Sequence, residues 1–349
     1  MNKFASETKN MKNLFLILSV CTLNSAIAQN NDSAQVYYKK GLEEKTALRF
    51  LVANQAFEKA VKFNPSFTEA HLQNAYALME MRKTDQAIAA FVKVNELQPE
   101  NKDAIKELSN LYFSYRQYPK AIEFAQKCTG CENANRITGI SYYQQEDYPA
   151  AVKALTAALT ANEKDAEVTY TLGRTYLDME EYKKAVPYYE KAVKLDATKN
   201  VWMYELGLLY YNNNDYKNAV IYFNNAAVNG YLQSNDFKEN LGYASLYSDD
   251  YEKGETLLMG IWTKKPGNKD IIRDMAEILY QRKQYDKSLS YCQKLMELDA
   301  KDGKALYQAG LCFQKKGEKD RGQKMCDKAI ELDPSLNSLR KKQEMPGGM

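Results

Sequence analysis

A spacing of 34 residues between similar side chains constrains the fold of this 349-residue chain more than any other feature. The stretch 166–199 shows the repeating unit. Its first half places Leu172, Gly173 and Tyr176 on one helical face, and its second half places Ala185 and Tyr189 on another. Residues three or four positions apart share a face of a helix. The pattern predicts two short amphipathic helices joined by a turn. One such pair cannot bury both apolar faces alone, so similar pairs should flank it.

The same register recurs along almost the whole chain. The predicted repeats are 34–67, 68–101, 102–131, 132–165, 166–199, 200–233, 235–268, 269–302 and 303–336. Two places depart from the spacing. The repeat 102–131 is four residues short, and Ser234 is a single inserted residue. Regular recurrence over nine units predicts a repeat protein rather than a set of separate globular domains.

This spacing, Leu-Gly-x-x-Tyr in the first helix and Ala-x-x-x-Phe/Tyr-x-x-Ala in the second, resembles the tetratricopeptide repeat, a 34-residue helix–turn–helix unit. The resemblance implies an all-α fold, a right-handed superhelical solenoid of about nine units whose first helices line the concave face. Pro334 closes the last repeat. We expect residues 337–349 to form a short capping helix and a loose tail, since a solenoid end needs a polar cap.

The start of the chain has the pattern of a secretory signal. Lys12 precedes the apolar run 14–23, and small residues stand at Ala26 and Ala28. We predict that residues 1–28 are a signal peptide, that cleavage occurs before Gln29, and that the mature protein is periplasmic or associated with the bacterial cell envelope. A polar lead, 29–33, would then precede the array.

Two alternatives concern the same segment. Lipid attachment at Cys21 would make the protein a lipoprotein, but Val20 stands where a bacterial lipobox has Gly, Ala or Ser. Cleavage before Gln29 is therefore the preferred prediction. Residues 1–10 could also be an upstream extension that is not translated, because Met11 with Lys12 would make a compact signal start.

Charge and composition exclude several classes of function. The chain has 48 basic and 45 acidic side chains, without the basic stripe that nucleic-acid binding requires. No apolar run is long enough to keep the mature chain in a bilayer. The single histidine, His71, falls where the tetratricopeptide family usually has Trp, which favours packing over catalysis. The glycines show no phosphate-binding loop. We therefore expect a non-catalytic protein without cofactor or metal.

The cysteines fit an exported protein. Cys128 and Cys131 form a C-x-x-C that lacks the following His of a haem site and the further ligands of a zinc site. A local disulfide across the shortened turn is the preferred interpretation, and a redox role is the alternative. The last two repeats contain Cys292, Cys312 and Cys326 on faces expected to be buried. Reduced thiols are slightly favoured there over one bridge through Cys312, because packed helix axes lie about 8–10 Å apart.

The family resemblance implies which residues face a partner. In the family the second, fifth, ninth, twelfth and thirteenth residues of each repeat point inward, and this chain has 27 Tyr against 12 Phe and 2 Trp. Tyr and Arg are frequent at binding hot spots. The expected partner-binding residues are Tyr76, Asn110, Arg136, Tyr143, Tyr170, Arg174, Tyr204, Tyr211, Asn212, Tyr243, Arg273, Tyr280 and Tyr307. Glu239, Tyr247 and Glu277 occupy inward positions as well. For each ring, packing between successive first helices is the alternative.

One known mode of recognition can be tested on the sequence. Arrays of this family that clamp a C-terminal carboxylate use Lys and Asn, then Asn, Lys and Arg from the next two repeats. Lys106 and Asn110 match the first pair, but Ile137 replaces the next Asn. Glu167 and Thr171 replace Lys and Arg. A carboxylate would lack its charged donors, so we reject this clamp.

The sequence as a whole predicts an exported scaffold or adaptor that binds a protein or peptide in its concave groove. A glycan or peptidoglycan strand is an alternative ligand, because sugars stack on tyrosine rings. The identity of the partner, the biological pathway and the oligomeric state are not predicted by any residue pattern.

Overall fold

The structure is a computed structural model that describes residues 30–339. The predicted signal peptide and most of the predicted C-terminal cap lie outside the described residues. Two compact units make up the chain, Met1–Met179 and Glu180–Met349. The division falls inside the predicted repeat 166–199. We call the described parts, 30–179 and 180–339, the N-terminal unit and the C-terminal unit.

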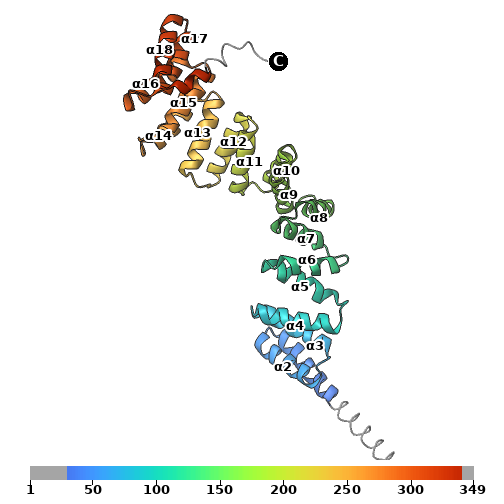
Figure 1. Cartoon of the computed structure of the whole chain (residues 1–349). Coiled ribbons are helices and arrows are strands. Elements are labelled where there is room, and N and C mark those ends of the chain that lie inside the picture. The colour runs from blue at the N-terminus through green and yellow to red at the C-terminus, as the bar shows by residue number, and fades with distance from the viewer. Residues whose placement is uncertain (1–29, 340–349) are drawn as a thin grey trace, which may run out of the picture. The chain divides into compact units, whose positions relative to one another are not determined.

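The N-terminal unit is a series of short helices in chain order (Figure 1). Residues 30–46 are helical and precede α2. The helices that follow are α2 (Phe50–Phe63), α3 (Thr68–Glu80), α4 (Thr84–Leu97), α5 (Lys102–Ser114), α6 (Tyr118–Lys127), α7 (Ala134–Gln144), α8 (Tyr148–Ala161) and α9 (Ala166–Asp178). At 10 residues, α6 is shorter than the 14-residue helices α2, α4 and α8, and it belongs to the repeat that is four residues short.

The C-terminal unit continues the same alternation of helix and turn. Its helices are α10 (Tyr182–Leu195), α11 (Asn200–Asn212), α12 (Tyr216–Val228), α13 (Asn235–Tyr247), α14 (Tyr251–Trp262), α15 (Asp270–Gln281), α16 (Tyr285–Leu298), α17 (Gly303–Lys315) and α18 (Lys319–Leu332). A 3-10 turn, η1 (Pro334–Leu336), follows α18. No strand occurs among residues 30–339.

Consecutive helices pack against one another within each unit. In addition, the odd-numbered helices contact each other directly, as α5 does with α7, α7 with α9, α13 with α15 and α15 with α17. These are the first helices of their repeats, and we call the side on which they lie in each unit the first-helix face. The prediction of an all-α helical repeat solenoid is confirmed.

Glycines allow the two helices of a pair to cross closely. A Cβ atom built on Gly207 in α11 would lie 2.6 Å from the ring of Phe223 in α12, which is closer than real Cβ contacts. The same holds in the next repeat, where a Cβ on Gly242 would lie 2.8 Å from Leu258. Phe223 and Leu258 are fully buried. The small residue on the first helix therefore leaves room for the large residue on the second.

The turns between paired helices share one backbone conformation. Among the described residues, eight other than glycine have a positive φ, and each is the fifteenth residue of a predicted repeat: Leu48, Arg82, Arg116, Glu146, Glu180, Asn214, Asp249 and Lys283. Gly317 takes the same place in the last repeat, with φ 95°. Successive members are 34 residues apart, except for one interval of 30 at the shortened repeat and one of 35 at the inserted Ser234. The left-handed residue thus recurs with the repeat even where glycine is absent.

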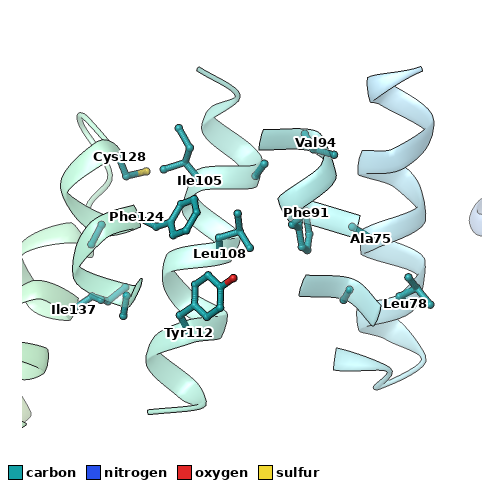
Figure 2. Close-up of a cluster of buried hydrophobic side chains, with 14 residues drawn as sticks. Ala75, Leu78, Phe91, Val94, Ile105, Leu108, Tyr112, Phe124, Cys128 and Ile137 are labelled. Atoms are coloured by element: carbon teal, nitrogen blue, oxygen red, sulfur yellow. The ribbon is translucent and has the colours of Figure 1, made fainter. Parts of the chain in front are cut away.

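The core is a layer of small clusters rather than one large centre. Figure 2 shows the cluster made by α3 to α7, in which Phe91 and Leu108 are fully buried beside Tyr112 and Phe124. Burying each such side chain contributes about 1.5–3 kcal/mol. Cys128 lies at the edge of this cluster and is also buried.

The C-terminal end of the array is closed by η1. Leu336 is buried against α17 and α18, together with Tyr307, Cys326 and Ala329. Residues 337–339 are helical and exposed, and the rest of the predicted cap lies outside the described residues. Across residues 30–339, no helix is both long and apolar enough to cross a membrane.

Candidate functional site

Three first helices of the C-terminal unit form a hollow of about 230 Å³. Tyr211 from α11 and the pair Tyr243 and Tyr247 from α13 supply its aromatic walls. Its remaining lining comes from α15, with Asp274, Glu277 and Ile278. We call this feature the tyrosine–acid hollow.

Helical spacing explains why these side chains meet. Tyr243 and Tyr247 are four residues apart on α13, and Asp274 and Ile278 are four residues apart on α15, so each pair projects from one side of its helix. Contact between α13 and α15 then brings the two pairs together. The hydroxyl of Tyr243 donates to Oδ2 of Asp274 at 3.1 Å, which fixes the ring against the neighbouring repeat.

A tyrosine from a second helix supports the rings. Tyr216, the first residue of α12, stacks on Tyr247 with ring centroids 4.4 Å apart and planes 16° from parallel. It also meets Tyr211 edge-on at 5.4 Å. Aromatic pairs at these distances are favourable beyond their buried area. Tyr216 therefore holds the two rings on either side of it in place.

This ring pair is a recurring device. The twelfth residue of a repeat meets the tyrosine that begins the second helix in Phe113–Tyr118, Tyr143–Tyr148, Tyr211–Tyr216 and Tyr280–Tyr285, with centroids 5.4–6.4 Å apart. Tyrosine stands at the start of the second helix in six repeats, at 118, 148, 182, 216, 251 and 285. The abundance of tyrosine thus has a structural cause within the array as well as a surface role.

The hollow has a negative electrostatic character. Burial raises the pKa of the Tyr243 phenol, and the nearby carboxylates of Asp274 and Glu239 raise it further. Burial also raises the pKa of Asp274, which the hydrogen bond from Tyr243 partly offsets. Glu239 has a pKa raised by burial, then by Asp236 and Asp274. Each shift has the direction expected where negative charges gather without enough positive charge to balance them.

The arginine beside the hollow is already paired. Arg273 donates to Oδ2 of Asp302 at 2.9 Å and lies 3.5 Å from Asp270. Asp302 is the N-cap of α17, where its other oxygen accepts from the backbone N–H of Ala305 at 3.0 Å. Arg273 therefore forms ion pairs that join two repeats and does not pair with the carboxylates that line the hollow.

Comparison with known proteins agrees with the repeat pattern. Two family models, both described as tetratricopeptide repeat, match the chain, one over residues 138–200 and 170–234 and the other over 68–101 and 303–336. These segments are tetratricopeptide repeats. No curated protein sequence matches it.

Solved structures of repeat proteins resemble the array in fold. YrrB, described as a tetratricopeptide protein with an unusual peptide-binding site, is 24% identical over 55% of this chain and 100% of its own, with a TM-score of 0.39. PilF of Pseudomonas aeruginosa is 19% identical over 71% and 99% of the two chains, with a TM-score of 0.34. The C-terminal part of a repeat protein from Cytophaga hutchinsonii is 18% identical over 68% and 98%, with a TM-score of 0.42. At these identities the likeness concerns the fold alone.

Within this tetratricopeptide array, some of the predicted partner-binding residues line the hollow and others pack against neighbouring repeats. Tyr211 and Tyr243 line the hollow, together with Tyr247 and Glu277 from inward positions. Asp274 and Ile278 line it although the family register does not predict them, because they are the sixth and tenth residues of their repeat. Asp274 could have been found from the sequence by its spacing of three residues from Glu277, which places two carboxylates on one face of α15.

Residues at the fifth position of a repeat mainly join neighbouring repeats, and three of the predicted partner-binding residues show this. Arg136 donates to Asp165 at 3.2 Å and pairs with Glu167, as Arg273 does with Asp302 in the C-terminal unit. Tyr307 is only 4% exposed, because Leu336 and its neighbours cover it.

Tyr204, also at a fifth position, is partly buried and likewise contacts the neighbouring repeat. Its ring stacks on Tyr231 at 4.4 Å and packs against Phe223 and Phe237 at 5.5 and 5.6 Å. Asn240 donates to its hydroxyl at 2.8 Å. The family register predicts this ring on the open face, but it belongs to the aromatic packing between α11, α12 and α13.

The remaining predicted residues lie along the first helices without forming a second tyrosine–acid hollow among the described residues. Tyr76 meets Phe91 edge-on at 5.3 Å, and Tyr143 donates to Asp178 at 2.9 Å. Arg174 donates to the hydroxyl of Tyr170 at 3.4 Å. Asn110 and Tyr280 are partly buried, and Asn212 is exposed.

The C-x-x-C lies apart from the hollow, in the N-terminal unit. Cys128 and Cys131 are joined by a disulfide directly after the short helix α6. A hollow of about 650 Å³ adjoins the disulfide, lined mainly by Ala and Thr side chains with Tyr142 and Lys153. Its polar side chains include Gln126 and Asn135, and of the residues that the structure describes no charged side chain other than Lys153 lines it. Among the described residues, no cluster of His, Cys, Asp and Glu has the arrangement of a metal site.

The three other cysteines of the predicted mature chain are buried near the C-terminal end. Burial raises the pKa of the Cys292 thiol to about 12. The Sγ atom of Cys312 lies 3.3 Å from the hydroxyl of Ser288, and Cys326 approaches the carbonyl of Tyr307 at 3.7 Å. These thiols pack and hydrogen-bond inside the last two repeats.

Proposed function

We propose that the protein is a non-catalytic scaffold of the bacterial cell envelope that binds a protein or peptide segment on the first-helix face. Tetratricopeptide repeats suggest a protein–protein interaction scaffold, and the first-helix face is where neighbouring repeats present side chains side by side. The observation that carries the proposal is the tyrosine–acid hollow, because three rings and two carboxylates converge there from three repeats. Aromatic rings with adjacent polar groups are typical of binding hot spots.

Export is the second part of the proposal. The pattern of Lys12, the apolar run 14–23 and Ala28 supports a cleaved signal and a mature chain that begins at Gln29. The disulfide between Cys128 and Cys131 supports an oxidising compartment, since such bonds persist outside the cytosol. Sequencing the N-terminus of protein from the native host would test this, and a lipid-modified chain beginning at Cys21 would favour the lipoprotein alternative.

A peptide ligand fits the hollow better than a glycan or a redox partner does. A glycan stacks on open ring faces, whereas one face of Tyr247 is covered by Tyr216. A redox role needs an accessible sulfur, whereas Cys128 is 4% exposed and Cys131 is partly buried. A protein segment can instead place one side chain between the rings and use the adjoining first helices for the rest of its length.

Photo-crosslinking in the native host would test the proposed face. A photoreactive residue placed at Glu277 lies in the hollow, and one at Glu297 on α16 serves as the matched control in the same repeat. We expect a discrete protein adduct from position 277 and none from position 297. Adducts from 297 alone would place recognition on the second helices, and the proposed face would be wrong.

A further inference from the structure

The tyrosine–acid hollow indicates the chemistry of the partner. We propose that it takes the side chain of one lysine or arginine from the bound protein segment. This inference rests on the proposed function, because it specifies what the first-helix face recognises. The size of the hollow, its charge and contacts that the chain makes elsewhere all support it.

The size of the hollow suits one long side chain. Its volume of about 230 Å³ lies below the range of about 300–1,000 Å³ that is common for small-molecule and cofactor pockets. Ile278 and the rings of Tyr211 and Tyr243 give it apolar surface, and Asp274 and Glu277 add carboxylates. A lysine or arginine matches this mixed lining, since its methylene stem packs on apolar surface while its charged end needs polar partners.

The charge of the hollow selects a cation. Asp274 and Glu277 line it directly, and Glu239 lies close enough to raise the pKa of Tyr243. Besides burial, the charged groups that raise the pKa of Tyr243 are the carboxylates of Asp274 and Glu239, and both are negative at neutral pH. Arg273, the cation acting on Asp274, is engaged by Asp302 and Asp270. A positive side chain would therefore relieve repulsion that the hollow now contains.

The rings add a second attraction for the same charge. An ammonium or guanidinium group within about 6 Å of a tyrosine ring centre is attracted by the π-system. The chain already uses such contacts, since Lys45 lies 5.1 Å from the ring centre of Tyr76 and Lys287 lies 5.6 Å from that of Tyr251. In the hollow, rings and carboxylates stand close enough to act on one cation together.

An anionic group does not fit this face. The residues that would clamp a carboxylate are replaced or occupied, because Ile137 is buried and the hydroxyl of Thr171 donates to the carbonyl of Glu167. In the hollow itself a carboxylate would face Asp274 and Glu277. Charge complementarity thus favours a basic segment of a partner over an acidic one.

A peptide library tests the inference on the mature chain. Beads displaying random decapeptides are sorted for binding to three proteins, namely the wild type, the hollow variant Asp274→Asn with Glu277→Gln, and the control Glu252→Gln with Glu297→Gln. Asparagine at 274 can still accept the hydrogen bond from Tyr243, so the fold should be kept, which circular dichroism and the melting midpoint check. The control removes the same charge from α14 and α16.

We expect peptides selected by the wild type and by the control to be enriched in Lys or Arg at one position. Replacing that residue by norleucine should weaken binding about tenfold, as should the hollow variant. Selected peptides without this enrichment would overturn the inference and leave the proposed function standing. If the hollow variant still selects peptides enriched in Lys or Arg, the cationic side chain binds at another site and the inference is wrong. Failure of the wild type to retain any peptide would contradict both proposals.

Discussion

Position within the repeat decides what a side chain does in this array. Fifth residues such as Arg136, Tyr204 and Arg273 contact the neighbouring repeat, whereas Tyr211 and Tyr243, at the twelfth and ninth places, line the hollow. The family pattern treats all of these positions as inward-facing. The difference arises from side-chain length and position. A long side chain at the fifth position extends to the N-cap carboxylate or the aromatic cluster of the next repeat.

Replacing Tyr204 tests this at the residue scale. Tyr204→Ala removes a stacked ring from the cluster with Phe223, Tyr231 and Phe237, so we expect a loss of about 2 kcal/mol in the free energy of unfolding. Ile221→Ala on α12 is the control, because that side chain is 51% exposed and should change stability by no more than about 0.5 kcal/mol. Urea denaturation followed by circular dichroism measures both. Equal stability of the two variants would show that the ring of Tyr204 does not stabilise the aromatic cluster.

Part of the candidate site could be predicted from sequence and part could not. Tyr211 and Tyr243 follow from the register of the repeat. The roles of Tyr204 and Tyr307 could not be predicted, since register says which way a residue points but not what Tyr231 or Leu336 brings to meet it. Such neighbours come from turns and from the end of the array, where the repeating pattern is interrupted.

At the scale of the element, the ends of first helices are tied to the preceding repeat. Asp165 caps α9 and accepts from Arg136, and Asp302 caps α17 and accepts from Arg273. One carboxylate thus satisfies a helix terminus and fixes the angle between two repeats. The caps follow from sequence, because Asp before a helical pattern is a start signal. Their arginine partners do not, because the pairs join residues about thirty positions apart.

Substituting Asp302, the N-cap of α17, measures how much this contact between two repeats contributes to stability. Asp302→Ala should lower the free energy of unfolding by about 2 kcal/mol or more, since a cap contributes about 0.5–2 kcal/mol and the side chain is only 6% exposed. Asp302→Asn keeps an oxygen for Ala305 and should cost less. A double-mutant cycle with Arg273→Met isolates the ion pair. A coupling energy of zero would mean that the arginine and the cap act independently.

At the scale of the molecule, each unit is a series of repeats that contact their neighbours. Such arrays transmit a local change mainly to adjacent repeats. The family match and the spacing of left-handed turns describe the same period, which is why the fold is predictable from sequence. The division of the chain between residues 179 and 180 could not be predicted from the sequence. It falls inside the repeat 166–199, which has the most regular sequence pattern of all.

A change at one helix crossing tests the spread of such effects. Gly207→Val would force a branched side chain against Phe223, which lies 2.6 Å from the position of the new Cβ, at a cost of about 1–3 kcal/mol. Hydrogen exchange should quicken in α11, α12 and α13 and stay unchanged in α17 and α18. Uniform loosening throughout the C-terminal unit would contradict nearest-neighbour behaviour.

The measurement that tests the central claim most directly is a pull-down of the partner that crosslinking identifies, using protein without a photoreactive residue whose hollow is filled. Glu277→Trp should occupy the space between Tyr243 and Ile278, and Glu297→Trp adds the same ring to α16 as a control. If the first-helix face binds the partner through the hollow, recovery should fall at least about tenfold for position 277 alone, because blocking an anchor pocket costs about 2 kcal/mol or more. Melting midpoints of the two variants should agree. Equal recovery by both variants, with equal melting, would contradict the claim that this hollow is the binding site.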